Sequence, residues 1–94
     1  MKLEWSAAAL AYLDRFAAFL HDRHPQLAKT IADQIRQRTS LLEEYPLIGR
    51  AIEGRPHFRE LVLEVANATY IFWYACDDEQ LVMLRVFHSR EARE

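Results

Sequence analysis

The stretch RELVLEVANATYIFWYACDDEQLVMLRVFH, residues 59–88, decides the fold. Apolar and polar residues alternate along Arg59–Val65, which is the period of a strand with one buried face. Thr69–Cys76 and Leu81–His88 are rich in β-branched and aromatic residues, as strands are. Short polar segments separate the three runs, and Ala66-Asn67-Ala68 is typical of a hairpin turn. The second half of the chain therefore predicts a three-stranded antiparallel meander.

Upstream of this meander the apolar spacing changes from two residues to that of helices. Ser6 is a suitable N-cap, and the pattern predicts a helix over Ser6–His24. Pro25 suits the first turn of a second helix, Pro25–Glu44, which Pro46 ends. Because the connection is so short, the two helices should form an antiparallel hairpin. The apolar stripe of the first helix consists of Leu10, Leu13, Phe16, Ala17 and Leu20.

The element order is therefore β-α-α-β-β-β in one α+β domain, residues 1–94. The helical hairpin should cover one face of a small antiparallel sheet, with Leu3–Trp5 as an added edge strand. Both glycines lie in Leu47–His57, which reads as a long irregular connection. Connections of that length are often functional.

Composition excludes several classes of protein. With 12 Lys and Arg against 14 Asp and Glu, the formal net charge is −2, whereas bulk nucleic-acid binders are usually basic. The single cysteine, Cys76, excludes an internal disulfide framework and suits the reducing cytosol. No apolar run approaches the roughly 18 residues of a membrane span, and the N-terminal residues do not resemble a signal peptide. We therefore expect a cytoplasmic protein with no membrane partner.

Three ionisable side chains of the meander are candidates for chemistry. Arg59 opens the first strand, Arg85 interrupts an apolar strand, and His88 ends that strand. Together they could stabilise a phosphorane-like transition state, with His88 as general acid. The alternative is structural, because an arginine inside an apolar strand needs a counter-charge. Glu60 or Glu64 across the sheet would then pair with Arg85.

The aromatic strand 69–76 predicts a second kind of surface. One helical hairpin covers only one face of a sheet, so apolar residues on the other face are left for a partner. Ile71 and Trp73 are then expected in the core. The candidates for partner binding, together with the outer side of the first helix, are Phe72, Tyr74, Met83 and Phe87.

Two further clusters have the residue types of metal sites. His21 and His24 lie three positions apart near a helix end, and Asp77-Asp78-Glu79 forms an acidic run. The ordinary interpretation of the first is a solvated helix terminus, and that of the second is a hairpin tip. We expect neither a metal nor a cofactor.

The chain also resembles toxins of the RelE/ParE superfamily over Leu3 to about Arg90. LEEYPLIGR (42–50) resembles their "L…P.IGR" signature, and REL (59–61) resembles the start of their first meander strand. YIFWY (70–74) is similar to their "Y.I.Y" strand, and LRVFHSR (84–90) to their closing strand. The opening LEWS before an alanine-rich helix also fits.

This resemblance implies the toxin of a type II toxin–antitoxin pair. Its partner would be a ribbon-helix-helix-like or similar DNA-binding antitoxin whose disordered C-terminal segment folds on the toxin. RelE-like members cleave mRNA in the ribosomal A site, whereas ParE-like members poison DNA gyrase without nuclease chemistry. The motif wording, the acidic charge and a C-terminal tail without tyrosine or histidine favour the ParE branch.

The ParE interpretation assigns no catalytic residue. Its candidate target contacts are Arg59, Arg85, His88, Arg90 and Arg93. If the chain were instead a RelE-like ribonuclease, Arg59, Arg85 and His88 would be catalytic. A toxin fold with another or a lost activity is the third alternative.

Overall fold

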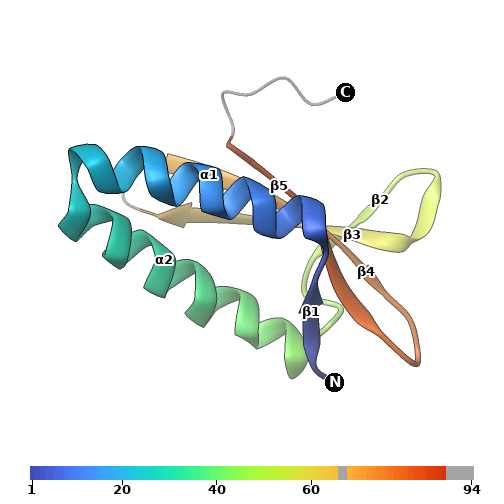
Figure 1. Ribbon diagram of the computed structural model, residues 1–94. Helices are drawn as coiled ribbons and strands as arrows, with labels where there is room; N and C mark the ends of the chain where they lie inside the picture. The colour runs from blue at the N-terminus through green and yellow to red at the C-terminus, as the bar shows by residue number, and fades with distance from the viewer. Residues whose placement is uncertain (66–67, 89–94) are drawn as a thin grey trace.

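The computed structural model describes residues 1–65 and 68–88, and within them the chain has the expected α+β architecture. Two helices lie side by side over one face of a sheet, and the hairpin of β2 and β3 extends beyond them (Figure 1). No helix lies within the described part of residues 59–76. The elements are β1 (Leu3–Trp5), α1 (Ala7–Arg23), α2 (Pro25–Ser40), a 3-10 turn (Leu41–Glu43), β2 (Arg50–Ile52), β3 (Arg55–Val65), β4 (Ala68–Cys76) and β5 (Leu81–His88).

The sheet has five strands in the order β1-β5-β4-β3-β2. The meander β3-β4-β5 is antiparallel, as predicted, and β1 is the expected edge strand. However, β1 runs parallel to β5, with Leu3 opposite Leu81, so the sheet is mixed rather than purely antiparallel. Both helices and the strands β2, β3 and β4 lie between β1 and β5 in the chain. This pairing therefore joins the strands of the sheet that are farthest apart in sequence.

The prediction of an irregular connection over Leu47–His57 is wrong in its second half. Residues 50–52 form β2, and β3 begins at Arg55, four residues earlier than expected. Gly54 takes a φ of +79° in the two-residue turn between them, a conformation that favours glycine. Pro56 argues against a strand, but it lies where the pairing register shifts, so its missing N–H is tolerated.

Local sequence signals set the helix ends. The Ser6 hydroxyl accepts a hydrogen bond from the Ala9 amide at 3.1 Å, which confirms the predicted N-cap. Pro25 occupies the first turn of α2, also as predicted. The second helix ends at Ser40 rather than Glu44, because the last residues tighten into a 3-10 turn.

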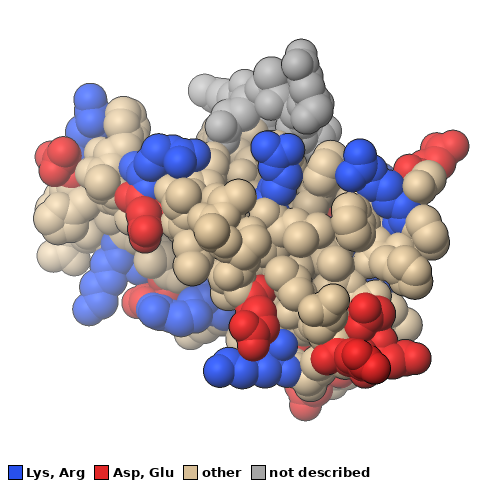
Figure 2. All heavy atoms as spheres, turned by 45° about the vertical axis from the view of Figure 1, so that its right-hand side comes forward, with Lys and Arg blue, Asp and Glu red and all other residues tan. Residues whose placement is uncertain are grey.

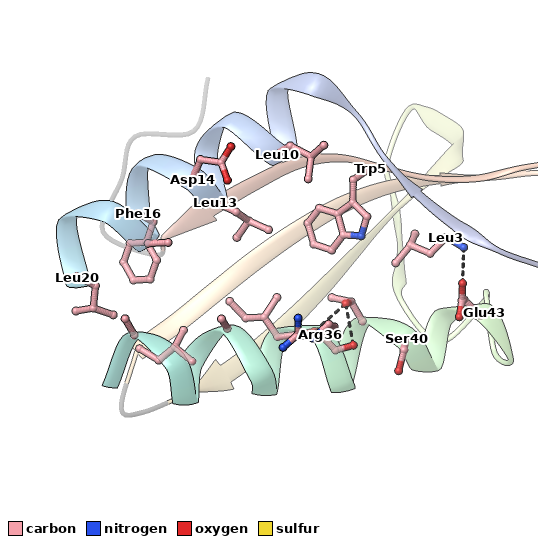
Figure 3. Close-up of a pocket in the computed structure, with 16 residues that line it drawn as sticks. Leu3, Trp5, Leu10, Leu13, Asp14, Phe16, Leu20, Arg36, Ser40 and Glu43 are labelled. Carbon is pink, nitrogen blue, oxygen red and sulfur yellow. Dashed lines mark hydrogen bonds between the residues drawn. The ribbon is translucent and has the colours of Figure 1, made fainter. Parts of the chain in front are cut away.

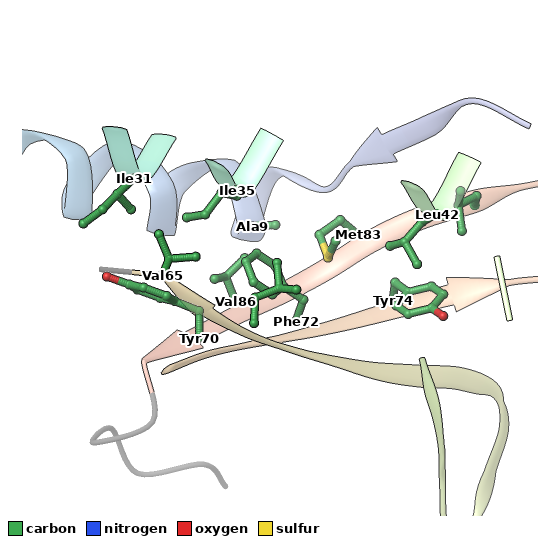
Figure 4. Packing of buried hydrophobic residues seen from close by; sticks show 12 residues of the cluster. Ala9, Ile31, Ile35, Leu42, Val65, Tyr70, Phe72, Tyr74, Met83 and Val86 are labelled. Atoms are coloured by element: carbon green, nitrogen blue, oxygen red, sulfur yellow. The ribbon is translucent and has the colours of Figure 1, made fainter. Parts of the chain in front are cut away.

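The core lies between the helices and the sheet. Tyr70, Phe72 and Tyr74 of β4 are at most 1% exposed. They point from the sheet toward α2 and the 3-10 turn, where Ile31, Ile35 and Leu42 face them (Figure 4). This contact aligns the helical hairpin with the strands.

A β-bulge at Leu84 changes the alternation of β5. Tyr74 is opposite Met83 and Trp73 is opposite Arg85, so Leu84 is an extra residue on this strand. The Ser6 hydroxyl donates to the Leu84 carbonyl at 2.8 Å, and the Ser6 amide donates to the Met83 carbonyl at 2.8 Å. The N-cap of α1 is thereby tied to the bulge.

Candidate functional site

The three side chains of the nuclease hypothesis do not meet. Arg59 is opposite Tyr74, and His88 is opposite Tyr70, so both share the helix-covered face of the sheet but lie four β4 residues apart. Arg85 is opposite Trp73 and is exposed on the other face. Four strand residues span roughly 13 Å. The described residues therefore do not assemble these groups into one reaction site.

Arg59 instead holds the chain that precedes β2. Its guanidinium Nη1 donates to the Gly49 carbonyl at 2.7 Å and to the Leu47 carbonyl at 3.4 Å. Each bond satisfies a backbone carbonyl of the segment that connects the 3-10 turn to β2. Arg59 thus has a structural role that its position at the start of a strand did not indicate.

The same segment is bound from β4 by Tyr74. The Tyr74 hydroxyl donates to the Pro46 carbonyl at 2.7 Å and accepts from the Gly49 amide at 2.9 Å. Burial raises the pKa of the Tyr74 phenol, and the Gly49 N–H and the Arg59 charge offset part of that rise. Gly49, Arg59 and Tyr74, which come from three separate motifs of the resemblance, are therefore joined by hydrogen bonds around one segment.

On the open face of the sheet, charged and aromatic residues form a row across four strands. Arg50, Glu60, Trp73 and Arg85 are successive cross-strand neighbours. Glu60, whose side chain is 10% exposed, accepts from Arg50 Nη2 and from Trp73 Nε1, each at 2.8 Å. Ion pairing of Arg85 with Glu60 or Glu64 was expected but is not among the ion pairs of the described residues.

Arg85, at the β5 end of that row, lies over the aromatic ring of Phe87. Its guanidinium carbon is 5.5 Å from the centroid of Phe87, and Trp73 packs edge-on against the same ring at 5.2 Å. The bulge explains the misinterpretation of Arg85, because it turns this residue to solvent in a strand that otherwise reads as buried. An exposed arginine needs no buried counter-charge.

The predicted partner-binding residues are mostly core. Phe72, Tyr74 and Met83 are 0% exposed and lie under the helices, and Phe87 is 8% exposed on the other face. The expectation that they form an open surface is wrong, since the helices cover the opposite parity of β4 from the one assumed. Ile71 is 7% exposed but lies outside the core cluster, on the open face with Trp73.

A hollow that was not predicted from the sequence lies between the two helices. It is an open groove of about 500 Å³. Leu13 and Phe16 of α1 and Trp5 of β1 point into it toward α2 (Figure 3). Asp14, Arg36 and Glu43 are the charged residues among its lining. The apolar lining includes Leu3, Trp5, Leu10, Leu13, Phe16, Leu20, Ile31 and Ile35.

A sequence signal for this groove existed in the width of the apolar stripe. Ala9 is fully buried against the sheet, whereas Leu10, assigned to the core by its spacing, is 48% exposed. A stripe wide enough to include both positions exceeds what one sheet contact requires. The excess faces the neighbouring helix and stays open.

The two metal-like clusters have ordinary roles. The Asp77 carboxylate accepts from the amides of Glu79 and Gln80 at 2.8 and 2.9 Å, and these bonds lower its pKa. His21 and His24 are both exposed at the junction of the helices. Within residues 1–65 and 68–88, no group of three or more His, Cys, Asp or Glu could hold a metal ion.

The surface charge is mixed. On the face in Figure 2, acidic side chains gather at the lower right, and basic ones are scattered along the upper edge and at the lower left among uncharged residues. No helix in the described part of the chain is long and apolar enough to cross a membrane. Arg90 and Arg93, two of the expected target contacts, lie outside the described residues.

Comparison with known proteins gives the family. The profile described as "ParE toxin of type II toxin-antitoxin system, parDE" matches residues 3–93. A solved chain described as "Chromosomal ParDE TA system from P. aeruginosa" has the same fold, with a TM-score of 0.73 and 21% identity over 94% of this chain and 95% of that one. No curated protein matches the sequence. This chain therefore belongs to the ParE toxin family of type II toxin–antitoxin systems.

Proposed function

We propose that this toxin acts in the cytoplasm by binding and inhibiting DNA gyrase, and that a helical segment of its cognate antitoxin neutralises it by occupying the α1–α2 groove. The antitoxin would carry a ribbon-helix-helix-like or similar DNA-binding domain. In this account the toxin is an inhibitor rather than an enzyme.

The separation of Arg59, Arg85 and His88 on the sheet is the observation that favours a binding mechanism over a nuclease mechanism. Cleavage of RNA at a 2′-hydroxyl needs a base, an acid and cationic groups around one phosphate. Here Arg59 binds backbone carbonyls, and Arg85 faces solvent on the other side of the sheet. A binding inhibitor has no such requirement, because it needs only complementary contacts with its target.

The charge distribution supports the same choice. Affinity for nucleic acid comes largely from neutralising phosphates with Lys and Arg. The whole chain has a net charge of −2, and the described residues visible in Figure 2 form no continuous basic surface. A ribosome-bound nuclease would be expected to present one.

The groove supports the antitoxin part of the proposal. Amphipathic helices bind apolar grooves through residues spaced three and four apart. This groove is apolar along both helices and reaches β1 at one end, and Asp14 and Arg36 supply charges of both signs. Burial of such a surface would also strengthen a toxin whose small core leaves a narrow stability margin.

Expression of the toxin without and with its antitoxin tests the target. The proposal predicts growth arrest without antitoxin, plasmid DNA that loses negative supercoiling, and mRNA without codon-specific cuts. Antitoxin should reverse the arrest. Cleaved mRNA with normal supercoiling would favour the RelE-like alternative. If supercoiling and mRNA are both unaffected, the alternative of a different or lost activity is favoured.

A pair of variants on α1 tests the groove. Leu10 lines the groove and is 48% exposed, whereas Phe19 is 56% exposed but does not line it. Leu10→Glu should weaken antitoxin binding by about 10-fold or more, because it places a charge in an apolar contact. Phe19→Glu should leave that affinity unchanged. The reverse result would place the antitoxin on the outer side of α1.

A further inference from the structure

A short turn before β2 exposes three large apolar side chains. The turn Tyr45–Ile48 is closed by a hydrogen bond from the Ile48 amide to the Tyr45 carbonyl at 3.2 Å, and we call it the 45–48 turn. Tyr45, Leu47 and Ile48 are 55%, 65% and 50% exposed. Leu47 is the most exposed large hydrophobic residue of the described chain. Single exposed apolar residues are ordinary, but three on one turn form a patch.

The backbone of this turn is nevertheless held by the sheet. Tyr74 of β4 bonds both the Pro46 carbonyl and the Gly49 amide, and Arg59 of β3 bonds the Gly49 carbonyl. The Tyr74 anchor is 0% exposed. The turn is therefore fixed from beneath while its own apolar side chains point outward.

Such an arrangement suits recognition. A surface loop that is already ordered loses little conformational entropy when it binds, so more of its contact energy appears as affinity. Tyr45 is moreover of a residue type that is enriched among the few side chains that dominate binding energy at protein interfaces. A turn that served only to connect α2 to β2 would not need three exposed apolar residues.

The charges beside the turn indicate its partner. Arg50 lies two residues after the turn, and its side chain is 81% exposed even though it contacts Glu60. Arg55 and His57 are exposed on the adjoining hairpin, and the acidic residue Glu53 is exposed at its turn. Glu44, also exposed, directly precedes the turn, so a complementary surface would be an apolar pocket bordered by charges of both signs, with a carboxylate opposite Arg50.

From these observations we infer that the 45–48 turn, flanked by Glu44 and Arg50, is the surface through which the toxin contacts an apolar pocket of its protein target that is bordered by charges of both signs. This inference rests on the proposed function and assigns it a surface. The α1–α2 groove and the 45–48 turn share no lining residue, so each can be altered without the other.

The double variant Leu47→Ser/Ile48→Ser tests the inference, with Val62→Ser as the matched control. Val62 is 50% exposed, like Ile48, but lies on the open face of β3. The double variant should raise the concentration needed to inhibit gyrase supercoiling by about 30-fold and should abolish growth arrest. Its affinity for antitoxin should stay within about threefold of wild type. The control should behave as wild type in all three assays.

Other outcomes would overturn the inference. Full toxicity of the double variant would show that the turn is not a target contact. Loss of antitoxin affinity would assign the turn to the antitoxin. If wild type cleaved ribosome-bound mRNA and the double variant did not, the turn would contact RNA or the ribosome. If the double variant unfolds, Leu47→Ser alone gives the same comparison. If wild type arrests growth but does not inhibit supercoiling, the gyrase proposal fails, and the growth and antitoxin assays still decide the role of the turn.

Discussion

The hydroxyl of Tyr74 accepts a hydrogen bond from the amide of Gly49 at 2.9 Å, although 25 residues separate them in sequence. The same hydroxyl donates to Pro46, so one side chain in the middle of the sheet orders the connection between α2 and β2. Gly49 and Tyr74, which lie in two separate motifs of the resemblance, are thus in direct contact. It fixes the geometry of the exposed turn beside it.

Tyr74→Phe should remove both hydrogen bonds and leave the Gly49 amide and the Pro46 carbonyl without that partner. We expect a loss of about 1–3 kcal/mol in the free energy of unfolding, since the contact is buried. Urea denaturation measures it. Tyr45→Phe is the control, because Tyr45 is 55% exposed and should change stability by less than about 0.5 kcal/mol. Equal stabilities of the two variants would contradict the role given to Tyr74.

Gly49→Ala should destabilise the protein for a steric reason. A Cβ at this position would lie 2.5 Å from the Tyr74 hydroxyl oxygen and 2.6 Å from Cε1 of that ring. We expect a loss of about 1–3 kcal/mol, as for other overpacked sites. Gly54→Ala is informative beside it, because its cost comes from a φ of +79° with no neighbour within 4 Å. Adding Tyr74→Phe should recover part of the stability lost in Gly49→Ala and none of the stability lost in Gly54→Ala.

Ser6→Ala should uncouple α1 from the bulge in β5. The Ser6 hydroxyl bonds both the Ala9 amide and the Leu84 carbonyl, so its removal should cost about 1–3 kcal/mol. Ser40→Ala removes only an exposed bond to the Gln37 carbonyl and should be nearly neutral. Hydrogen exchange should show faster opening at the start of α1 in the first variant alone. Unchanged exchange there would exclude the proposed coupling.

The protein should lose stability at alkaline pH. Burial raises the pKa of Tyr70 and of Tyr74 above the value of about 10 that tyrosine has in an unfolded chain. Between these values the folded state keeps protons that the unfolded state has released, so stability falls as pH rises above about 10. A tyrosinate absorbance titration combined with circular dichroism should show these two phenols ionising only as the fold is lost. Ionisation of all four tyrosines in the folded state would contradict this.

Local periodicity was enough to predict the helices and the meander. The limits of β5 were predicted at Leu81–His88, and those of α1 differ by one residue at each end. These elements have long, regular patterns and clear end signals, such as Ser6 and Pro25. The short strand β2 has neither, because a three-residue strand shows no period and Pro56 argues against its partner.

The features that could not be predicted from the sequence depend on contacts between residues that are far apart in the chain. The face of β4 that the helices cover is not encoded in Tyr70–Tyr74, since both parities are large and apolar. The carbonyl of the bulged residue Leu84 accepts a hydrogen bond from Ser6, 78 residues away, and the bulge places Arg85 on the open face. Likewise, Arg59 looks like a free cation until the folded chain brings the Gly49 carbonyl to it. The open groove depends on how far apart the helices pack.

The central claim is that the toxin acts by binding, and supercoiling by purified gyrase tests it most directly. Wild type and His88→Ala should be titrated against gyrase acting on relaxed plasmid, with ribosome-bound mRNA incubated in parallel. The account predicts that both proteins inhibit supercoiling within about threefold of each other and leave the mRNA intact. A general acid would instead lose roughly 10²–10⁴ in rate on removal. Cleavage of mRNA by wild type that disappears in His88→Ala, with supercoiling unaffected by either protein, would contradict the account.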